Sequence, residues 1–182
     1  LRQRRQEDVL FVGSTRIDET SPVRSHQQKL ALLIAERASI CVIHSQYVEP
    51  TGSDTPPAGL GRMVDAIHAA GLLAGVSVHR VGVVTACERS GYGIDVYLFP
   101  LNLSGFVYPG YGGRETPQER ADLVRGTAKP FVLMKALGAG RIPPDEGLQF
   151  VAENCKPTDA VSIGFGSQAE MDETIKLAQG YF

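Results

Sequence analysis

Short apolar runs alternate with amphipathic segments along the whole chain. The apolar runs have the length and the β-branched content of buried strands. They are residues 9–13, 40–44, 73–78, 94–99, 131–135 and 160–163. Between these runs apolar residues recur at helical spacing, most regularly from Leu60 to Ile67, where they fall at i, i+3, i+4 and i+7 of one stripe. The pattern predicts six strands, each followed by a helix.

Turn and capping residues mark several of the helix boundaries. Gly71 comes just after the 60–67 stripe, where a helix commonly ends in a left-handed residue. Thr116 and Glu119 form a capping-box pattern with a proline at the first helical position, and Ser167 and Glu170 form a second capping box without the proline. We expect helices to begin after Thr116 and after Ser167. We expect further helices over 26–38, 81–90 and 145–155.

Strands that are apolar on both faces, each followed by a helix, predict a parallel sheet covered by helices. A closed barrel and an open doubly wound sheet both meet this description. No Gly-x-Gly-x-x-Gly follows the first strand, which disfavours an open dinucleotide-binding sheet. Polar residues collect at the carboxyl ends of the predicted strands, where a barrel carries its active site. The sequence therefore predicts an α/β fold of the (β/α)8 TIM-barrel class, with six βα units in a single domain over residues 1–182.

Composition and charge narrow the function classes. The chain has 182 residues, whereas a complete eight-fold barrel has about 250, so we expect fewer than eight βα units. A formal net charge of −2 excludes the broad basic surface of a nucleic-acid-binding protein. No apolar stretch is long enough to span a membrane, and the first residues do not begin a signal peptide. Three scattered cysteines, and histidines without converging partners, predict neither a disulfide framework nor a metal site, and favour a cytoplasmic protein.

Two glycine-rich turns are the strongest candidate site. Residues 137–141 follow the fifth predicted strand, and residues 164–167 follow the sixth. Glycine allows the backbone to approach an anion closely, and a helix that begins at Ser167 directs its N–H groups at that anion. Lys135 and Arg141 add positive charge. We predict a phosphate site here; the alternative is that the glycines only form tight turns and Ser167 only caps its helix.

Histidines provide further candidates. His44 ends the second predicted strand, where it could donate a hydrogen bond to a carbonyl oxygen or move a proton, or could simply be a hydrogen-bonded rim residue. We expect His79 to end the third strand. Because side chains alternate along a strand, Ser77 and His79 then share a face, and both reach the ligand if that face points inward. His26 and His68 fall on predicted helices, and we interpret both as surface residues.

Two other features leave alternatives open. The loop over 104–115 is rich in glycine and contains Tyr108 and Tyr111, and it is either a substrate-covering lid, which the tyrosines and glycines favour, or a disordered segment. Lys135 could instead be a Schiff-base nucleophile, because a desolvated lysine in a barrel mouth can lose its proton.

Six strand-end motifs, taken in order, resemble those of the aldo/keto reductases. They are residues 9–16, 41–45, 75–77, 99–102, 134–138 and 164–175. The resemblance covers nearly the whole chain, from the family's third strand to its eighth, and it implies a barrel that is incomplete at its N-terminal side. It implies a (β/α)8 barrel that binds NADP or NAD across its mouth and reduces small carbonyl compounds. The family's catalytic tyrosine and aspartate come from segments that precede these residues.

The resemblance also implies roles for particular residues. His44 would orient the substrate carbonyl, and Ser77 would hydrogen-bond the nicotinamide amide. Arg16 stands where the family has its catalytic lysine, although a guanidinium does not release a proton at neutral pH. The remaining cofactor contacts would come from the last three strand ends, namely Asn102, Lys135, Leu137, Gly138, Gly164, Gly166, Ser167 and Glu173. His79, Tyr108 and Tyr111 would meet the substrate.

Three hypotheses about function follow. The first is an NAD(P)H-dependent oxidoreductase with a small carbonyl substrate. The second is a barrel enzyme without redox chemistry, such as a lyase, aldolase or isomerase on a sugar or sugar phosphate, motivated by Arg16 in place of the lysine. The third is a barrel that has lost catalysis. Fold alone does not choose among them, because barrels carry many chemistries.

Overall fold

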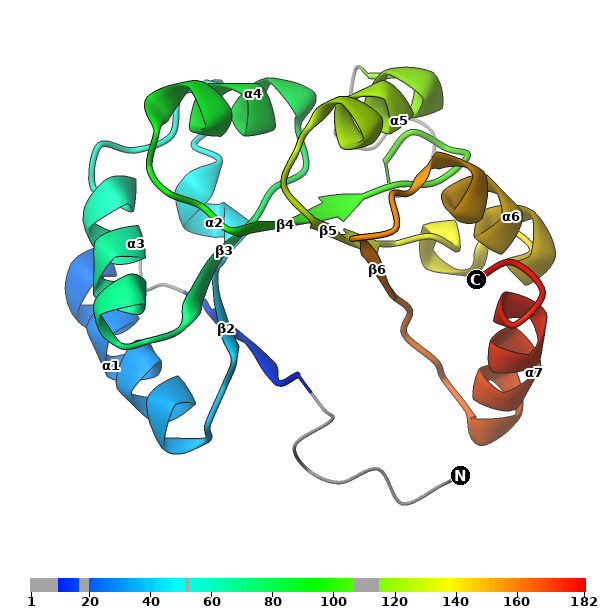
Figure 1. The fold of residues 1–182 in the computed structure, drawn as a ribbon, viewed down its shortest axis with the longest axis horizontal. Helices are drawn as coiled ribbons and strands as arrows, with labels where there is room; N and C mark the ends of the chain where they lie inside the picture. Colours follow the sequence, from blue (N-terminus) through cyan, green and yellow to red (C-terminus); the bar gives the residue numbers. More distant parts are fainter. Residues whose placement is uncertain (1–9, 17–19, 52, 107–114) are drawn as a thin grey trace. The chain divides into compact units, whose positions relative to one another are not determined.

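The structure is a computed structural model, and it describes residues 10–16, 20–51, 53–106 and 115–182. Strands and helices alternate through this part of the chain (Figure 1). The strands are β1 (Val12–Thr15), β2 (Ile40–Ile43), β3 (Leu73–Ser77), β4 (Val96–Pro100), β5 (Phe131–Met134) and β6 (Ala160–Ser162). The helices are α1 (Pro22–Ala35), α2 (Ser45–Val48), α3 (Leu60–Ala69), α4 (Val81–Ser90), α5 (Pro117–Gly126), the short 3-10 helix η2 (Gly138–Gly140), α6 (Pro144–Asn154) and α7 (Gln168–Ala178).

The six strands form one sheet in which each strand lies beside its neighbour in sequence, in the order β1-β2-β3-β4-β5-β6. The register pairs Val12 with Ile40, and Ile40 with Leu73, in parallel strands. At the other end of the sheet β5 and β6 are also parallel, with Val132 opposite Ala160. The predicted alternation of six strands with helices, in a parallel sheet, is confirmed.

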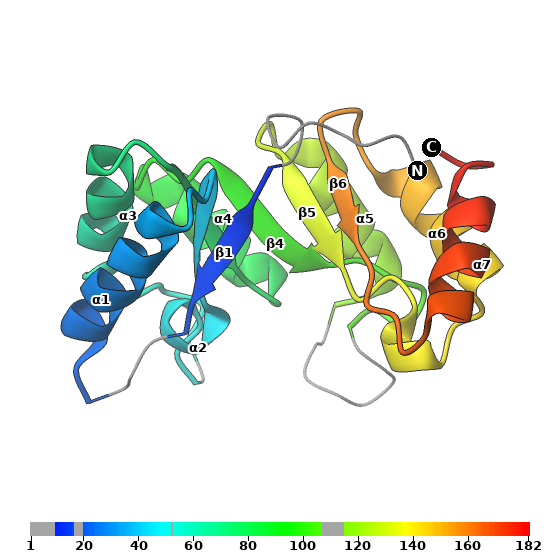
Figure 2. The same ribbon diagram turned by 90° about the horizontal axis from the view of Figure 1, so that it is seen from below.

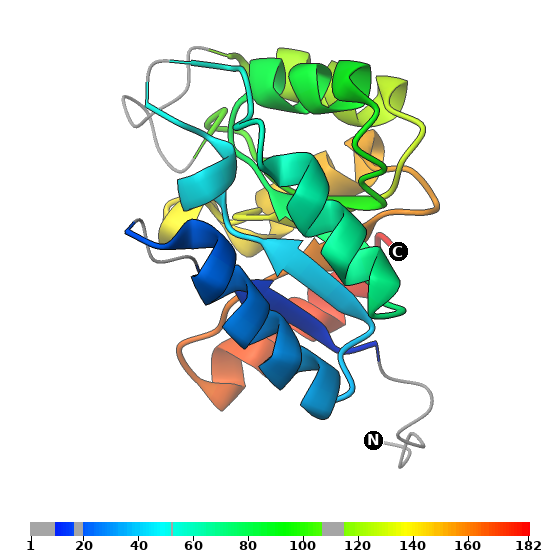
Figure 3. The same cartoon turned by 90° about the vertical axis from the view of Figure 1, so that its left-hand side faces the viewer.

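Contacts within the chain group into two compact units. The first unit contains residues 1–78 and 82–97, and the second contains residues 79–81 and 98–182. In the first unit α1 and α3 lie side by side and pack on β1 and β3 (Figure 3). In the second unit α6 packs against both α5 and α7 (Figure 2).

The core of the first unit is built on β2 and α3. All four residues of β2 are buried, and so is the predicted stripe of α3 from Leu60 to Ile67. Gly75 in β3 lets the strands pack closely, because a Cβ there would lie 3.0 Å from a methyl carbon of Val42. Gly71 has the expected left-handed backbone, with φ 77°. Burial raises the pKa of the Cys41 thiol in β2 to about 11.

The core of the second unit is aromatic and aliphatic. Phe99 and Phe131 meet edge to face with 6.0 Å between ring centroids, and Leu133 and Leu148 are fully buried in the same unit. The capping box predicted at Thr116 is confirmed: its hydroxyl accepts from the Glu119 N–H, and the Glu119 carboxylate accepts from the Thr116 N–H. α5 therefore begins where the sequence predicted.

The two end strands differ from the prediction. The first apolar run was expected to be a strand buried on both faces, but Leu10, Phe11 and Val12 are exposed. β6 is also exposed or half-buried at all three residues. Each of these strands has only one strand neighbour in the sheet order, so an apolar sequence there does not guarantee burial.

The packing of α3 on the sheet predicts a large effect of a single truncation. Ile67→Ala removes a fully buried side chain and leaves a cavity, so we expect the free energy of unfolding to fall by about 2–5 kcal/mol. Chemical denaturation measures this change. Ile34→Ala is the matched control, because Ile34 is also helical but 46% exposed, and its effect should stay within about 0.5 kcal/mol. Equal effects of the two changes would contradict the assignment of the core.

Candidate functional site

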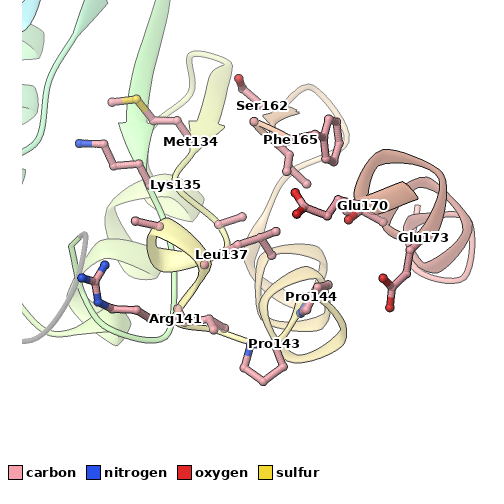
Figure 4. Close-up of a pocket in the computed structure, with 17 residues that line it drawn as sticks. Met134, Lys135, Leu137, Arg141, Pro143, Pro144, Ser162, Phe165, Glu170 and Glu173 are labelled. Carbon is pink, nitrogen blue, oxygen red and sulfur yellow. The ribbon is translucent and has the colours of Figure 1, made fainter. Parts of the chain in front are cut away.

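The two glycine-rich turns line one pocket in the second unit (Figure 4). The pocket has a volume of about 840 Å³ and lies between the turn after β5, the turn after β6 and helix α7. The prediction that these two turns lie together is confirmed. The predicted cofactor residues that line the pocket are Lys135, Leu137, Gly164 and Glu173. Gly138, Gly166 and Ser167 belong to the same turns but are not among its lining residues.

The turn after β5 has an unusual backbone. Lys135, Gly138, Ala139 and Gly140 all have positive φ, between 52° and 78°. Glycine adopts this conformation freely, whereas for Lys135 and Ala139 it costs roughly 1–2 kcal/mol each. The Gly138 N–H donates to the Lys135 carbonyl at 2.9 Å, which closes the turn. Strain of this kind persists only where surrounding contacts enforce it.

Charge is divided between the two sides of the pocket. Lys135 and Arg141 extend from the β5 side, with their cationic ends directed away from α7 (Figure 4). Glu170 and Glu173 come from α7 on the opposite side. Apolar side chains lie between, including Leu137 and Phe165. The pocket therefore suits a ligand with an anionic part at one end and hydrogen-bond donors at the other.

The start of α7 departs from the prediction. The Ser167 hydroxyl caps the helix by accepting from the Glu170 N–H at 3.2 Å, as expected. However, the Glu170 carboxylate accepts from the Gly166 N–H at 2.8 Å, where a complete capping box would use the Ser167 N–H. The Glu170 carboxylate thus already accepts a hydrogen bond from a backbone N–H in the turn that the sequence predicted to bind phosphate.

Asn102, a predicted cofactor contact, is fully buried and bonded within the chain. Its amide group donates to the Lys135 carbonyl at 2.9 Å and also to the Phe106 carbonyl. Its side-chain oxygen accepts from the Ser104 N–H at 2.9 Å. One amide hydrogen therefore closes the turn after β4, and the other joins that turn to the residue just after β5.

Phe106 collects three polar partners around its ring. The Lys135 ammonium lies 4.7 Å from the ring centroid, and the Arg120 guanidinium carbon lies 5.5 Å from it. His79 meets the same ring edge-on, with centroids 5.2 Å apart. The ring itself is buried. His79, which was predicted to contact substrate, thus packs against the same ring as Lys135, the residue just after β5.

Sequence reasoning missed Arg120, which is fully buried on α5. Its guanidinium pairs with Glu115 at 3.0 Å and donates to the His79 carbonyl at 2.8 Å. Glu115 also accepts from the N–H of Val81 at 3.0 Å, so this ion pair fixes the first residue of α4. The signal available was position: counted from the capping box, Arg120 lies on the same helical face as the buried Val124.

The remaining candidates lie at strand ends of the first unit. His44 is the N-cap of α2, and its Nδ1 accepts from the Gln46 N–H at 3.2 Å. In the neutral imidazole this leaves the proton on Nε2, so Nε2 is a hydrogen-bond donor. Ser77 is buried as the last residue of β3, and Arg16 is exposed after β1. Because β3 ends at Ser77, strand alternation does not extend to His79, and the prediction that they share a strand face is wrong.

The prediction that His26 is a surface residue is also wrong. His26 is only 1% exposed, and its Nδ1 lies 3.2 Å from the Thr15 hydroxyl at the end of β1. Burial lowers the pKa of His26 below its ordinary value of 6.5. α1 begins at Pro22, which places His26 one turn inside the helix and against the sheet. His68 is exposed as expected, and it pairs with Asp95 at 2.8 Å.

Tyr108 and Tyr111 lie outside the described residues. Within the ranges that the structure describes, no group of three or more His, Cys, Asp or Glu side chains could hold a metal ion. No helix in those ranges combines the length and the apolar character needed to cross a membrane.

No protein-family model and no curated protein sequence matches the chain. Solved structures do match. A Pseudomonas aeruginosa protein assigned to the aldo-keto reductases is 17% identical with a TM-score of 0.67, over 98% of this chain and 70% of that one. A second structure from that organism, also assigned to the aldo-keto reductases, gives a TM-score of 0.68. The 4-hydroxy-tetrahydrodipicolinate synthase of Methylacidiphilum fumariolicum SolV is 14% identical, with a TM-score of 0.63 over 96% of this chain and 60% of that one.

These likenesses concern the fold. Both kinds of neighbour are TIM-barrel enzymes, so the predicted fold class is confirmed, with six βα units in this chain. The similarity to aldo-keto reductases that the strand-end motifs indicated is confirmed at the level of structure, at low identity. The synthases share the same barrel, so the likeness alone does not choose between redox and lyase chemistry.

The buried His26 predicts a pH dependence of stability. Since its pKa is lowered in the folded state, the unfolded chain binds the proton first as the pH falls through 6.5. We expect the free energy of unfolding to be constant above about pH 7.5 and then to decrease by up to about 1.4 kcal/mol per pH unit from this group. Denaturant titrations between pH 8 and pH 5.5 measure the slope.

His26→Gln should flatten that slope, because it removes the group that the unfolded chain protonates. Leu30→Ala is the control, since it truncates a buried side chain of the same helix that carries no titratable group, and it should lower stability while leaving the slope as in the original protein. An unchanged slope in His26→Gln would contradict the role of burial.

Proposed function

We propose that the protein is an aldo-keto-reductase-like oxidoreductase, which binds a nicotinamide cofactor and reduces a small carbonyl compound. The observation that carries this proposal is the pocket shared by the two glycine-rich turns, with Lys135 and Arg141 on one side of it. The structural likeness to aldo-keto reductases and the order of the strand-end motifs support it. The net charge of −2 gives no support for a nucleic-acid partner.

The residues of the pocket fit a dinucleotide. Lys135 and Arg141 would bind the pyrophosphate, because cations attract phosphate oxygens strongly. Leu137 and Phe165 offer apolar surface for a ring, and Glu173 would accept from hydroxyl or amino groups at the adenosine end. Gly138, Gly164 and Gly166 would allow close approach of the backbone. When bound, the cofactor supplies the hydride.

We further propose that the protein prefers NAD to NADP. Glu170 and Glu173 stand on α7, and no lysine or arginine of that helix lines the pocket. A 2′-phosphate carries additional negative charge, and like charges at close range repel. Binding it would also have to compete with the Glu170 carboxylate for the Gly166 N–H.

The strand-end residues His44, Ser77 and Arg16 are proposed to have the roles that the family resemblance implies. The donor nitrogen of His44 would hydrogen-bond the carbonyl oxygen, and Ser77 would hold the nicotinamide amide. Arg16 would contribute a fixed positive charge without a transferable proton. His79, Tyr108 and Tyr111 remain proposed substrate contacts.

Cofactor binding tests the proposal directly. NADH at about a hundred times its dissociation constant should stabilise the protein by about 2.7 kcal/mol, which raises the melting temperature by roughly 5–10 °C. NADPH at the same concentration should give a smaller increase. The double variant Glu170→Gln/Glu173→Gln should narrow the difference, because the repelling charges are gone. Calorimetry measures all four cases.

The possible results separate the two claims. No increase with either cofactor removes the proposed function. A larger increase with NADPH than with NADH contradicts only the cofactor preference. Binding without turnover of any aldehyde or ketone would favour a catalytically inactive barrel.

A lyase or aldolase using Lys135 as a Schiff-base nucleophile is the second candidate. The likeness to a 4-hydroxy-tetrahydrodipicolinate synthase supports its fold, and Lys135 does stand at a strand end in the pocket. However, the Lys135 ammonium lies over the face of Phe106, an arrangement that stabilises the charged form. A Schiff-base lysine must be uncharged to attack a carbonyl, so this contact favours the first candidate.

Borohydride trapping distinguishes the two candidates. In the oxidoreductase, borohydride with a carbonyl substrate should leave Lys135 unmodified in mass spectra. In the same protein, His44→Gln should lower the rate of carbonyl reduction by about a hundredfold or more, as loss of a positioned donor does. A covalent adduct on Lys135, with turnover that needs no nicotinamide, would instead establish the lyase.

A further inference from the structure

We propose that Phe106 restrains the ammonium of Lys135 while the pocket is empty of ligand, and thereby sets the affinity of the pocket for an anion. This inference rests on the proposed function only in so far as the ligand carries a phosphate. Phe106 does not line the pocket, and no cofactor or substrate contact proposed above comes from it. It would act through Lys135, as a positioning residue.

The contact that carries the inference is well defined. The Lys135 nitrogen lies 4.7 Å from the centroid of the Phe106 ring, and the ring is only 8% exposed. Attraction between a cation and an aromatic face grows as water is removed from around it. The side chain of Lys135 belongs to the pocket wall, yet its charged end points away from α7 (Figure 4).

One buried amide holds this pair together. Asn102 donates to the carbonyl of Phe106 and to the carbonyl of Lys135, so the ring and the ammonium are joined through their backbones. Lys135 has a left-handed backbone, with φ 60°, which is unfavourable for a lysine. The strained residue is therefore kept in place by the same amide that fixes its aromatic partner.

Of the two cations on the ring, Lys135 is the one that lies at the pocket. The Arg120 guanidinium is bonded to Glu115 and to the His79 carbonyl, and it is fully buried. Lys135 is only half-buried and lies at the pocket. A hydrogen bond between an ammonium and a phosphate is stronger than a cation–aromatic contact, so a bound phosphate would draw Lys135 off the ring.

Removing the aromatic face should then tighten anion binding. Phe106→Leu keeps an apolar side chain in the buried site and removes the face that competes for the ammonium. We expect the dissociation constant for inorganic pyrophosphate to decrease by about two- to thirtyfold, the range of a cation–aromatic contact. NADH affinity should increase in the same sense.

Phe131→Leu is a matched control. Phe131 is also a buried phenylalanine of the second unit with a lysine over its ring, at 4.6 Å from Lys156, but neither residue lines the pocket. This change should leave pyrophosphate affinity as it was. Melting curves of each variant establish that it is folded at the temperature of measurement.

A double-mutant cycle tests the mechanism by titration calorimetry with inorganic pyrophosphate. Phe106→Leu should tighten binding in the original protein and have no effect when Lys135→Met is also present. A general loosening of the turn would change affinity equally in both backgrounds, and that result would overturn the proposal. Weaker binding in Phe106→Leu alone would overturn it as well.

The two proposals fail in different ways. If pyrophosphate shows the expected coupling but NADH does not bind, the restraint on Lys135 stands and the oxidoreductase does not. If NADH binds but the cycle shows no coupling, the oxidoreductase proposal stands and the restraint on Lys135 does not. If neither the original protein nor Phe106→Leu binds pyrophosphate at millimolar concentration, the pocket is not an anion site and the inference falls.

Discussion

Two neighbouring strands can run parallel only if the chain returns between them along the outside of the sheet. This requirement determines the arrangement of every element described here, because each strand is followed by a helix before its neighbour begins. It also separates two kinds of residue. The strands and the inner helix faces supply the apolar core, whereas the residues just after each strand can carry polar side chains that bind a ligand. Thr15, His44, Asn102 and Lys135 all lie at or just beyond strand ends for that reason.

The pocket shows how backbone shape and charge combine. The left-handed residues after β5 form a compact turn, and the Glu170 carboxylate bonded to Gly166 puts negative charge at the start of α7. Neither feature alone would identify a ligand. Together with the cations at the opposite side they define an axis of charge across the pocket, and the proposed preference for NAD is argued from that axis.

Local signals in the sequence were sufficient to predict many of the helix boundaries, part of the core and the position of the pocket. The stripe from Leu60 to Ile67, the capping box at Thr116 and the left-handed Gly71 each depend on neighbours within a few residues, and each was predicted. The two glycine turns were brought together by the order of strands, since β5 and β6 are adjacent in sequence and in the sheet. The prediction of the pocket therefore needed no long-range information beyond parallel pairing.

What escaped prediction depends on partners far along the chain. Arg120 is buried because Glu115, the His79 carbonyl and two aromatic rings surround it, and no spacing rule identifies a carbonyl 41 residues away. Likewise His26 is buried because α1 packs on β1. The Asn102 amide donates its hydrogen bonds to carbonyls on two separate segments. A polar residue is expected in water unless its partners are known. The exposed end strands were missed for the related reason that an apolar sequence does not reveal how many neighbours a strand has.

The buried thiol of Cys41 provides an internal reporter of how the sheet comes apart. It sits in the middle of β2 with no exposed surface, and its raised pKa keeps it protonated at neutral pH, so an alkylating reagent has no thiolate to attack in the closed molecule. Modification can then occur only in those moments when β2 has separated from its neighbours. The rate of labelling at this one sulfur therefore measures the free energy of local opening at the centre of the first unit, without any probe being added.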